Sequence, residues 1–114
     1  MKFKDRIEDG IGVLILKGKL MGYPETDELH DEMKSFLGQK IKNIVIDANG
    51  VSWMNSMGVG SLMRCLTTIR NAGGDLRLAR MSEKARSVFV ITQLISVFKI
   101  FETVEEGIES FKSE

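Results

Sequence analysis

Short apolar segments alternate with amphipathic segments along almost the whole chain, and this alternation restricts the fold more strongly than any other feature of the sequence. Two strands are expected around Asp9-Gly10, a pair typical of a hairpin turn. Strands that alternate with helices form a largely parallel sheet with the helices packed on it. The sequence therefore predicts an α/β fold with a mixed, mostly parallel sheet of about five strands and about four helices. The segments with strand character are residues 2–6, 8–18, 42–48, 75–80 and 97–101.

The helices are expected from their end signals and from apolar residues that recur on one face. Pro24 suits the first position of a helix, and Gly38 suits its end. Ser82 is a natural N-cap for a later helix, and Thr103 with Glu106 forms a capping box for the last one. The predicted helices span residues 23–38 and 56–71, and two more begin after Ser82 and Thr103.

The overall composition fits one domain over residues 1–114 and excludes several classes of function. Sixteen acidic residues balance sixteen basic ones, so no net field attracts nucleic acid. The single cysteine, Cys65, excludes an internal disulfide and a multi-cysteine metal site, and it is expected to be a small core residue. No apolar run approaches the ~20 residues that span a bilayer, and no signal-peptide core is present. We expect a cytoplasmic protein without membrane insertion.

Residues 48–55 are predicted to form a loop between a buried strand and the helix that begins near Ser56. In sheets of this kind, binding sites lie outside the carboxyl ends of the strands. Ser56 stands in this place, between Asn55 and Met57 and close to Trp53. The serine could be a nucleophile, a helix cap or a switch that takes up a phosphate, and the glycines that follow it could belong to a phosphate-binding loop.

The sequence argues against an enzyme. A hydrolase nucleophile elbow reads Gly-x-Ser-x-Gly and needs a histidine base, whereas Met54 occupies the first glycine position. The only histidine, His30, lies among acidic residues and is expected on the solvated face of its helix. Gly58 and Gly60 lack the third glycine of a dinucleotide fingerprint and the lysine of a P-loop. No catalytic residue, cofactor or metal ligand is therefore predicted.

A helix cap is the simplest interpretation, and Asn55 and Ser56 are both candidates for it. A cap at this point is compatible with phosphorylation, because a helix N-terminus offers unpaired N–H groups and a positive dipole end. Trp53 and the neighbouring methionines suit either a docking surface or the core, and the pattern does not separate the two. The arginines at positions 64, 70, 77 and 80 are expected to be solvated.

The order of the segments resembles that of STAS domains of the anti-sigma factor antagonist type. The likeness covers "VLILKGKL", "IVIDANGVSWMNSMGVGSL", "AGGDLRLARMSEKARSVFVITQL" and "VFKIFETVEEGI". The central family motif is approximately Asp-Ser-Ser/Thr-Gly-hydrophobic-Gly, and here it reads Asn55-Ser56-Met57-Gly58-Val59-Gly60. Asn55 replaces the acid and Met57 replaces the second hydroxyl. An acid that the family often has after its Gly-x-Leu segment is also missing, because Met21 and Gly22 follow there.

The resemblance implies a partner switch. The unphosphorylated protein would bind an anti-sigma factor that is also a serine kinase, phosphorylation of Ser56 would release it, and a serine phosphatase would reverse the modification. An alternative is a STAS subunit that is never phosphorylated and serves a transporter or signalling complex, which Asn55 and Met57 favour. A third is a sensor of a small ligand or nucleotide. The residues expected to bind the partner are Gly22, Tyr23, Trp53, Met54, Asn55, Ser56, Met57, Gly58 and Gly60.

Overall fold

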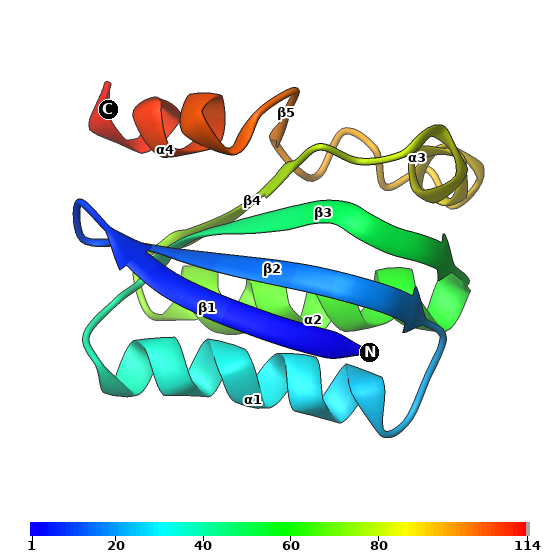
Figure 1. Ribbon diagram of the computed structural model, residues 1–114, viewed down its shortest axis with the longest axis horizontal. Helices are drawn as coiled ribbons and strands as arrows, with labels where there is room; N and C mark the ends of the chain where they lie inside the picture. The colour runs from blue at the N-terminus through cyan, green and yellow to red at the C-terminus, as the bar shows by residue number, and fades with distance from the viewer. Residues whose placement is uncertain (114) are drawn as a thin grey trace.

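The computed structural model describes residues 1–113 as one sheet with helices on both sides (Figure 1). The predicted hairpin is confirmed, and both Asp9 and Gly10 have positive φ angles, as a two-residue hairpin turn requires. The elements in chain order are β1 (Lys2–Glu8), β2 (Ile11–Leu20), α1 (Glu25–Gly38), β3 (Asn43–Met54), α2 (Ser56–Asn71), β4 (Asp75–Ala79), α3 (Glu83–Ile91), β5 (Ile100–Phe101) and α4 (Val104–Lys112).

The sheet has the strand order β1-β2-β3-β4-β5. β1 pairs with β2 in antiparallel orientation, and every later pair is parallel. The predicted mixed, mostly parallel sheet of five strands with four helices is therefore confirmed. Because successive parallel strands need crossover connections, the helices between them are placed on the faces and ends of the sheet.

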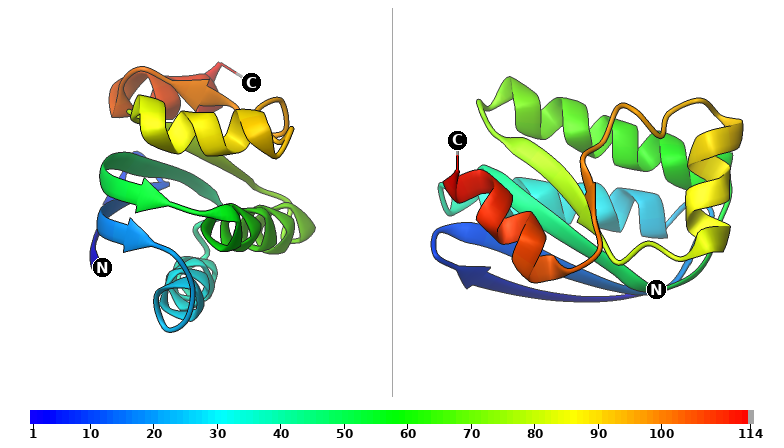
Figure 2. Two further views of the ribbon diagram at one scale, coloured as in Figure 1. Left: turned by 90° about the vertical axis from the view of Figure 1, so that its right-hand side faces the viewer. Right: turned by 90° about the horizontal axis from the view of Figure 1, so that it is seen from above.

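The buried apolar residues form two hydrophobic cores on the two faces of the sheet. The views in Figure 2 show the helices that cover these faces. α1 and α2 pack side by side over one face and enclose the larger core, which also takes in Ala85 and Phe89 of α3. α4 covers only part of the other face, with Val104 and Ile108 against Val13 and Val45. The rest of that second face, toward the beginning of β1, has no helix on it.

β2 and β3 terminate side by side at the same end of the sheet, where α1 and α2 begin (Figure 1, right). Leu20 pairs with Met54 in this register. The prediction of a loop over residues 48–55 is wrong, because β3 continues to Met54 alongside β2 through two register shifts. A single residue, Asn55, therefore connects β3 to α2.

The prediction that Arg77 is solvated is wrong, because the residue is only 2% exposed. Its Nε donates to Asp75 Oδ2 at 3.0 Å and its Nη1 donates to Ser110 Oγ at 2.7 Å. Its guanidinium carbon lies 3.9 Å from the centre of the Phe111 ring. A buried charge needs such partners. Asp75 lies on β4 like Arg77 itself, whereas Ser110 and Phe111 lie on α4, far along the chain. Arg77 therefore fixes α4 to the sheet.

Arg80 remains partly exposed, but its guanidinium forms a bidentate pair with Asp47. The Nε and Nη2 atoms each donate to one carboxylate oxygen at 3.0 Å. Arg64 and Arg70 are exposed, as predicted, and both lie in ion pairs with aspartates.

The expectation that His30 lies on the solvated face of its helix is also wrong. His30 is 7% exposed, and its Nε2 lies 2.8 Å from Thr68 Oγ1 on α2. Burial lowers the pKa of His30 below its ordinary value of 6.5, with Arg64 and Lys34 contributing in the same direction. The unfolded chain then binds more protons than the folded protein between the folded pKa and 6.5. This contribution to stability is complete above pH 6.5 and is lost as the pH falls.

We therefore expect the free energy of unfolding to decrease from pH 7 to pH 5.5, and to decrease less in His30→Gln. Denaturant titrations of both proteins at several pH values measure this difference. Parallel pH profiles of wild type and variant would contradict it.

Candidate partner-binding site

Asn55, rather than Ser56, caps α2. Its Oδ1 accepts a hydrogen bond of 3.0 Å from the backbone N–H of Gly58, and its backbone is extended as an N-cap requires. Its Nδ2 donates to the carbonyl oxygen of Met21 at 3.0 Å. One amide side chain thus connects the start of α2 to the segment that follows β2.

We expect Asn55→Ala to lower the free energy of unfolding by about 0.5–2 kcal/mol, because the cap is lost. Asn55→Asp retains the acceptor for the Gly58 N–H and adds a negative charge at the positive end of the helix, so its free energy of unfolding should fall less than that of Asn55→Ala. Chemical denaturation of wild type and the two variants measures the order of their stabilities. Equal stability of wild type and Asn55→Ala would show that the cap contributes nothing.

Ser56 is the first residue of α2 and is exposed. Within residues 1–113, no protein group forms a hydrogen bond with its hydroxyl. The first turn of α2 contains no acidic residue, whereas the first turns of α1, α3 and α4 each contain at least one. The hydroxyl is therefore free to react, and the dipole end next to it is not already compensated by a carboxylate.

Exposed apolar side chains stand on the two segments that meet at the start of α2, the end of β3 with the first turn of α2 and the segment after β2. Trp53 is 45% exposed, Met57 is 61% exposed, and Tyr23 is 81% exposed. Gly22 lies against Met57, since a Cβ built on the glycine would be 3.5 Å from Met57 Cε. We call the group made by Met21, Tyr23, Trp53, Ser56 and Met57 the α2-start surface. It lies at the edge that faces the viewer in the left view of Figure 2.

Some of the predicted site residues are exposed and others are buried in the core. Met54 is only 2% exposed and belongs to the larger core, so its predicted place on the surface is wrong. Gly58 is buried too, with its Cα facing the Leu20 carbonyl and the Met54 side chain. The structure brings Gly22 next to Met57 in the first turn of α2, and Tyr23, the next residue in the chain, is exposed. Met21, which is not among the predicted partner-binding residues, is exposed, and its carbonyl oxygen is bonded to Asn55 at the start of α2.

The site has no feature of a metal centre or a reactive thiol. Among residues 1–113, no cluster of three or more histidine, cysteine or acidic side chains is arranged to hold a metal ion. Cys65 is fully buried, which raises the pKa of its thiol to about 12. Its predicted role as a small core residue is confirmed. In the same part of the chain, no helix has the length and apolarity needed to cross a bilayer.

Comparisons with known proteins identify the family of the chain. The family model for the STAS domain matches residues 2–107. The chain is 22% identical over 105 residues to the candidate anti-sigma factor antagonist BtrV of Bordetella bronchiseptica, covering 92% of this chain and 90% of BtrV. It is 27% identical over 77 residues to a candidate anti-sigma factor antagonist of Thermotoga maritima, covering 68% of each chain.

Solved structures share the fold. A candidate anti-sigma factor antagonist of Thermotoga maritima superposes with a TM-score of 0.85 at 24% identity, covering 95% of this chain and 92% of that one. The unphosphorylated anti-sigma factor antagonist SpoIIAA superposes with a TM-score of 0.83 at 21% identity, covering 99% and 98%. Part of the murine anion transporter Slc26a9 also matches, with a TM-score of 0.76 at 13% identity over 92% of this chain and 18% of the transporter. With its five-stranded sheet, its four helices and a family match over nearly its whole length, the chain belongs to the STAS domain family.

Proposed function

We propose that this STAS domain is an anti-sigma factor antagonist that binds its partner through the α2-start surface and is released when Ser56 is phosphorylated. It acts as a binding module and not as an enzyme. The partner is an anti-sigma factor that is also the serine kinase, and a serine phosphatase restores binding. Relatives named as candidate anti-sigma factor antagonists support the general role. SpoIIAA, which shares the fold, has structures in an unphosphorylated and a phosphorylated form.

The observation that carries the proposal is the position of the Ser56 hydroxyl. It lies at an exposed helix start, and Trp53 and Met57, which stand on either side of Ser56 in the sequence, are exposed too. Aromatic residues and methionine are enriched at protein interfaces, and tryptophan is a frequent centre of binding energy. A partner that covers these side chains also covers the hydroxyl.

Phosphorylation at this position separates the bound state from the free state. In the free protein, the N–H groups at the start of α2 and the helix dipole stabilise a phosphate. In the complex, about −1.5 to −2 charges would enter a contact from which water is excluded. Desolvation of the phosphate therefore weakens the complex, whereas the fold of the free protein is unaffected.

An in vitro reaction with the candidate kinase and magnesium ATP, read by intact mass, tests the assignment. The candidate kinase is obtained by pull-down from the native cell with the wild-type protein. One phosphoryl group should appear on wild type and on Ser52→Ala, and none on Ser56→Ala. Ser52 is a matched control, because it is an exposed serine on the adjacent end of β3. Phosphorylation of Ser56→Ala at the wild-type rate would overturn the proposal.

A second candidate is a STAS subunit that binds its partner without phosphorylation, as part of a transporter or signalling complex. Asn55 and Met57 favour it, because they replace an acid and a hydroxyl of the family motif. The capping bond of Asn55 shows that the helix start does not need an acid here. This function predicts that no phosphoryl group is transferred by the partner and that binding is independent of charge at position 56.

A further inference from the structure

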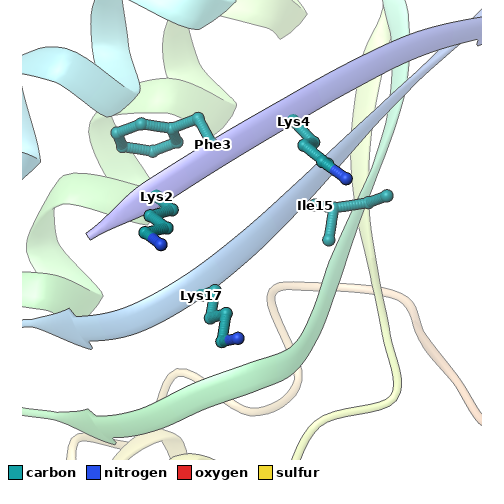
Figure 3. A pocket seen from close by; sticks show the side chains of 5 residues that line it. All are labelled: Lys2, Phe3, Lys4, Ile15 and Lys17. Atoms are coloured by element: carbon teal, nitrogen blue, oxygen red, sulfur yellow. The ribbon is translucent and has the colours of Figure 1, made fainter.

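The part of the second sheet face that α4 leaves uncovered contains a hollow with three lysines. The cavity has a volume of about 660 Å³ and is lined by Lys2, Phe3, Lys4, Ile15 and Lys17. Figure 3 shows the three lysine side chains and Ile15 on one side of the β1–β2 ribbon, with the Phe3 ring turned toward the helices. We call this feature the lysine hollow. Its volume falls within the range of small-molecule sites.

The arrangement of the three lysines is expected to lower the stability of the fold. Lys2 lies directly opposite Lys17 in the antiparallel ladder, and like charges in such pairs are destabilising. Within residues 1–113, the ion pairs include none of the three lysines. By contrast, the cation at the other end of β1, Arg6, has Glu8 beside it at 3.7 Å.

Protection of the sheet edge does not explain this arrangement. Charged residues on an edge strand prevent edge-to-edge pairing, and β1 is such a strand. Lys17 lies on β2, however, which is paired on both sides and has no edge to protect. An anion held between Lys2, Lys4 and Lys17 would offset their mutual repulsion.

We infer that the lysine hollow binds a compact phosphoryl-bearing anion. Lysine ammonium groups act as point charges and suit a phosphate, which presents oxygens in several directions, whereas planar carboxylates are matched best by the arginine fork. Ile15 provides an apolar wall for a carbon-containing part. Although Phe3 lines the hollow, its ring is turned toward the helices and packs against the larger core, so the ring is not placed for a nucleobase in the hollow to stack on it.

This inference does not depend on the proposed function, because the hollow and the α2-start surface share no residue. The ligand is either a free phosphorylated molecule or the headgroup of an anionic lipid, which present the same chemistry. Inorganic pyrophosphate is the soluble probe, and vesicles of phosphatidylglycerol in phosphatidylcholine are the lipid probe.

The test uses backbone amide NMR titration with pyrophosphate at constant ionic strength on wild type, Lys17→Glu and Lys84→Glu. Lys84 is a matched control, because it is an exposed lysine on α3 with the same change of charge. Chemical shift changes should concentrate on β1 and β2, and Lys17→Glu should weaken binding at least tenfold while Lys84→Glu retains it. Equal affinity in the two variants would overturn the inference.

Two further measurements complete the test. Without ligand, Lys17→Glu should melt about 2 °C or more above wild type, because a cross-strand attraction with Lys2 replaces a repulsion. A lower melting temperature would contradict the cost described above. Adenosine diphosphate should bind no more tightly than pyrophosphate, and tenfold tighter binding would show that the hollow recognises a base.

Sedimentation with vesicles distinguishes the two sources. Lys17-dependent sedimentation without pyrophosphate binding identifies a lipid headgroup, and the reverse result identifies a free ligand. Both results support a phosphoryl site. An absence of binding to both probes would overturn it.

Discussion

Gly58→Val is expected to lower the free energy of unfolding by about 3 kcal/mol or more, which corresponds to a decrease in melting temperature of roughly 10–15 °C. A Cβ at this position would collide with the backbone carbonyl of Leu20 and would lie 2.8 Å from Met54 Cγ. A backbone carbonyl within a parallel strand cannot move aside as the end of a flexible side chain can. The collision therefore separates α2 from β2. Thermal and denaturant unfolding measure the loss.

Gly60 provides the matched control in the same helix. It is exposed, and a Cβ there would have no atom within 4 Å. Gly60→Ala should stabilise the domain by about 0.5–1 kcal/mol, because glycine is a poor residue for a helix interior. If Gly58→Val melted at the wild-type temperature, the close approach of α2 to β2 would be disproved. If Gly58→Val and Gly60→Val were equally destabilised, the loss would belong to valine in a helix and not to the contact.

Ser56→Asp is expected to weaken binding of the cognate anti-sigma factor about a hundredfold or more, whereas Ser56→Ala should bind within a few-fold of wild type. A loss of ~3 kcal/mol produces such a change, and burial of an unpaired carboxylate among Trp53 and Met57 is sufficient to cause it. Both variants should remain folded, because Asn55 and not Ser56 caps the helix. Isothermal titration with the purified partner measures the affinities, and thermal melts confirm the fold.

Thr67→Asp separates a local effect from the general effect of added charge. Thr67 is exposed on the same helix, about 16 Å along its axis from Ser56. This variant should bind like wild type. Equal affinity of wild type and Ser56→Asp would rule out the switch, and equal weakening by Ser56→Asp and Thr67→Asp would show that net charge alone matters.

Features determined by neighbouring residues were predicted from the sequence. The bounds of α2 and the caps formed by Ser82 and Thr103 are confirmed, because each cap bonds to an N–H only three residues away. The hairpin turn at Asp9-Gly10 is equally local. The position of Ser56 at the start of a helix, on which the site depends, followed from the same kind of signal.

Features that depend on distant partners were not predictable in this way. His30 lies against Thr68, which is 38 residues away, and Arg77 lies against Ser110, which is 33 residues away. Met54 and Met57 are both methionines close to Ser56 in the sequence. Met54 is the last residue of β3 and is buried in the core, whereas Met57 lies in the first turn of α2 and is exposed. Only the length of the β2–β3 pairing decides which of the two is available to a partner.

The side chain of Asn55, held at one end by Met21 and at the other by Gly58, has a consequence for the speed of recognition. The two chain segments of the α2-start surface are already joined in the free protein, so a partner that binds there would cost little conformational entropy in this surface. Docking can then proceed at the rate of ordinary encounter without a preceding loop rearrangement. A modification at the neighbouring serine would act mainly on how long the complex lasts.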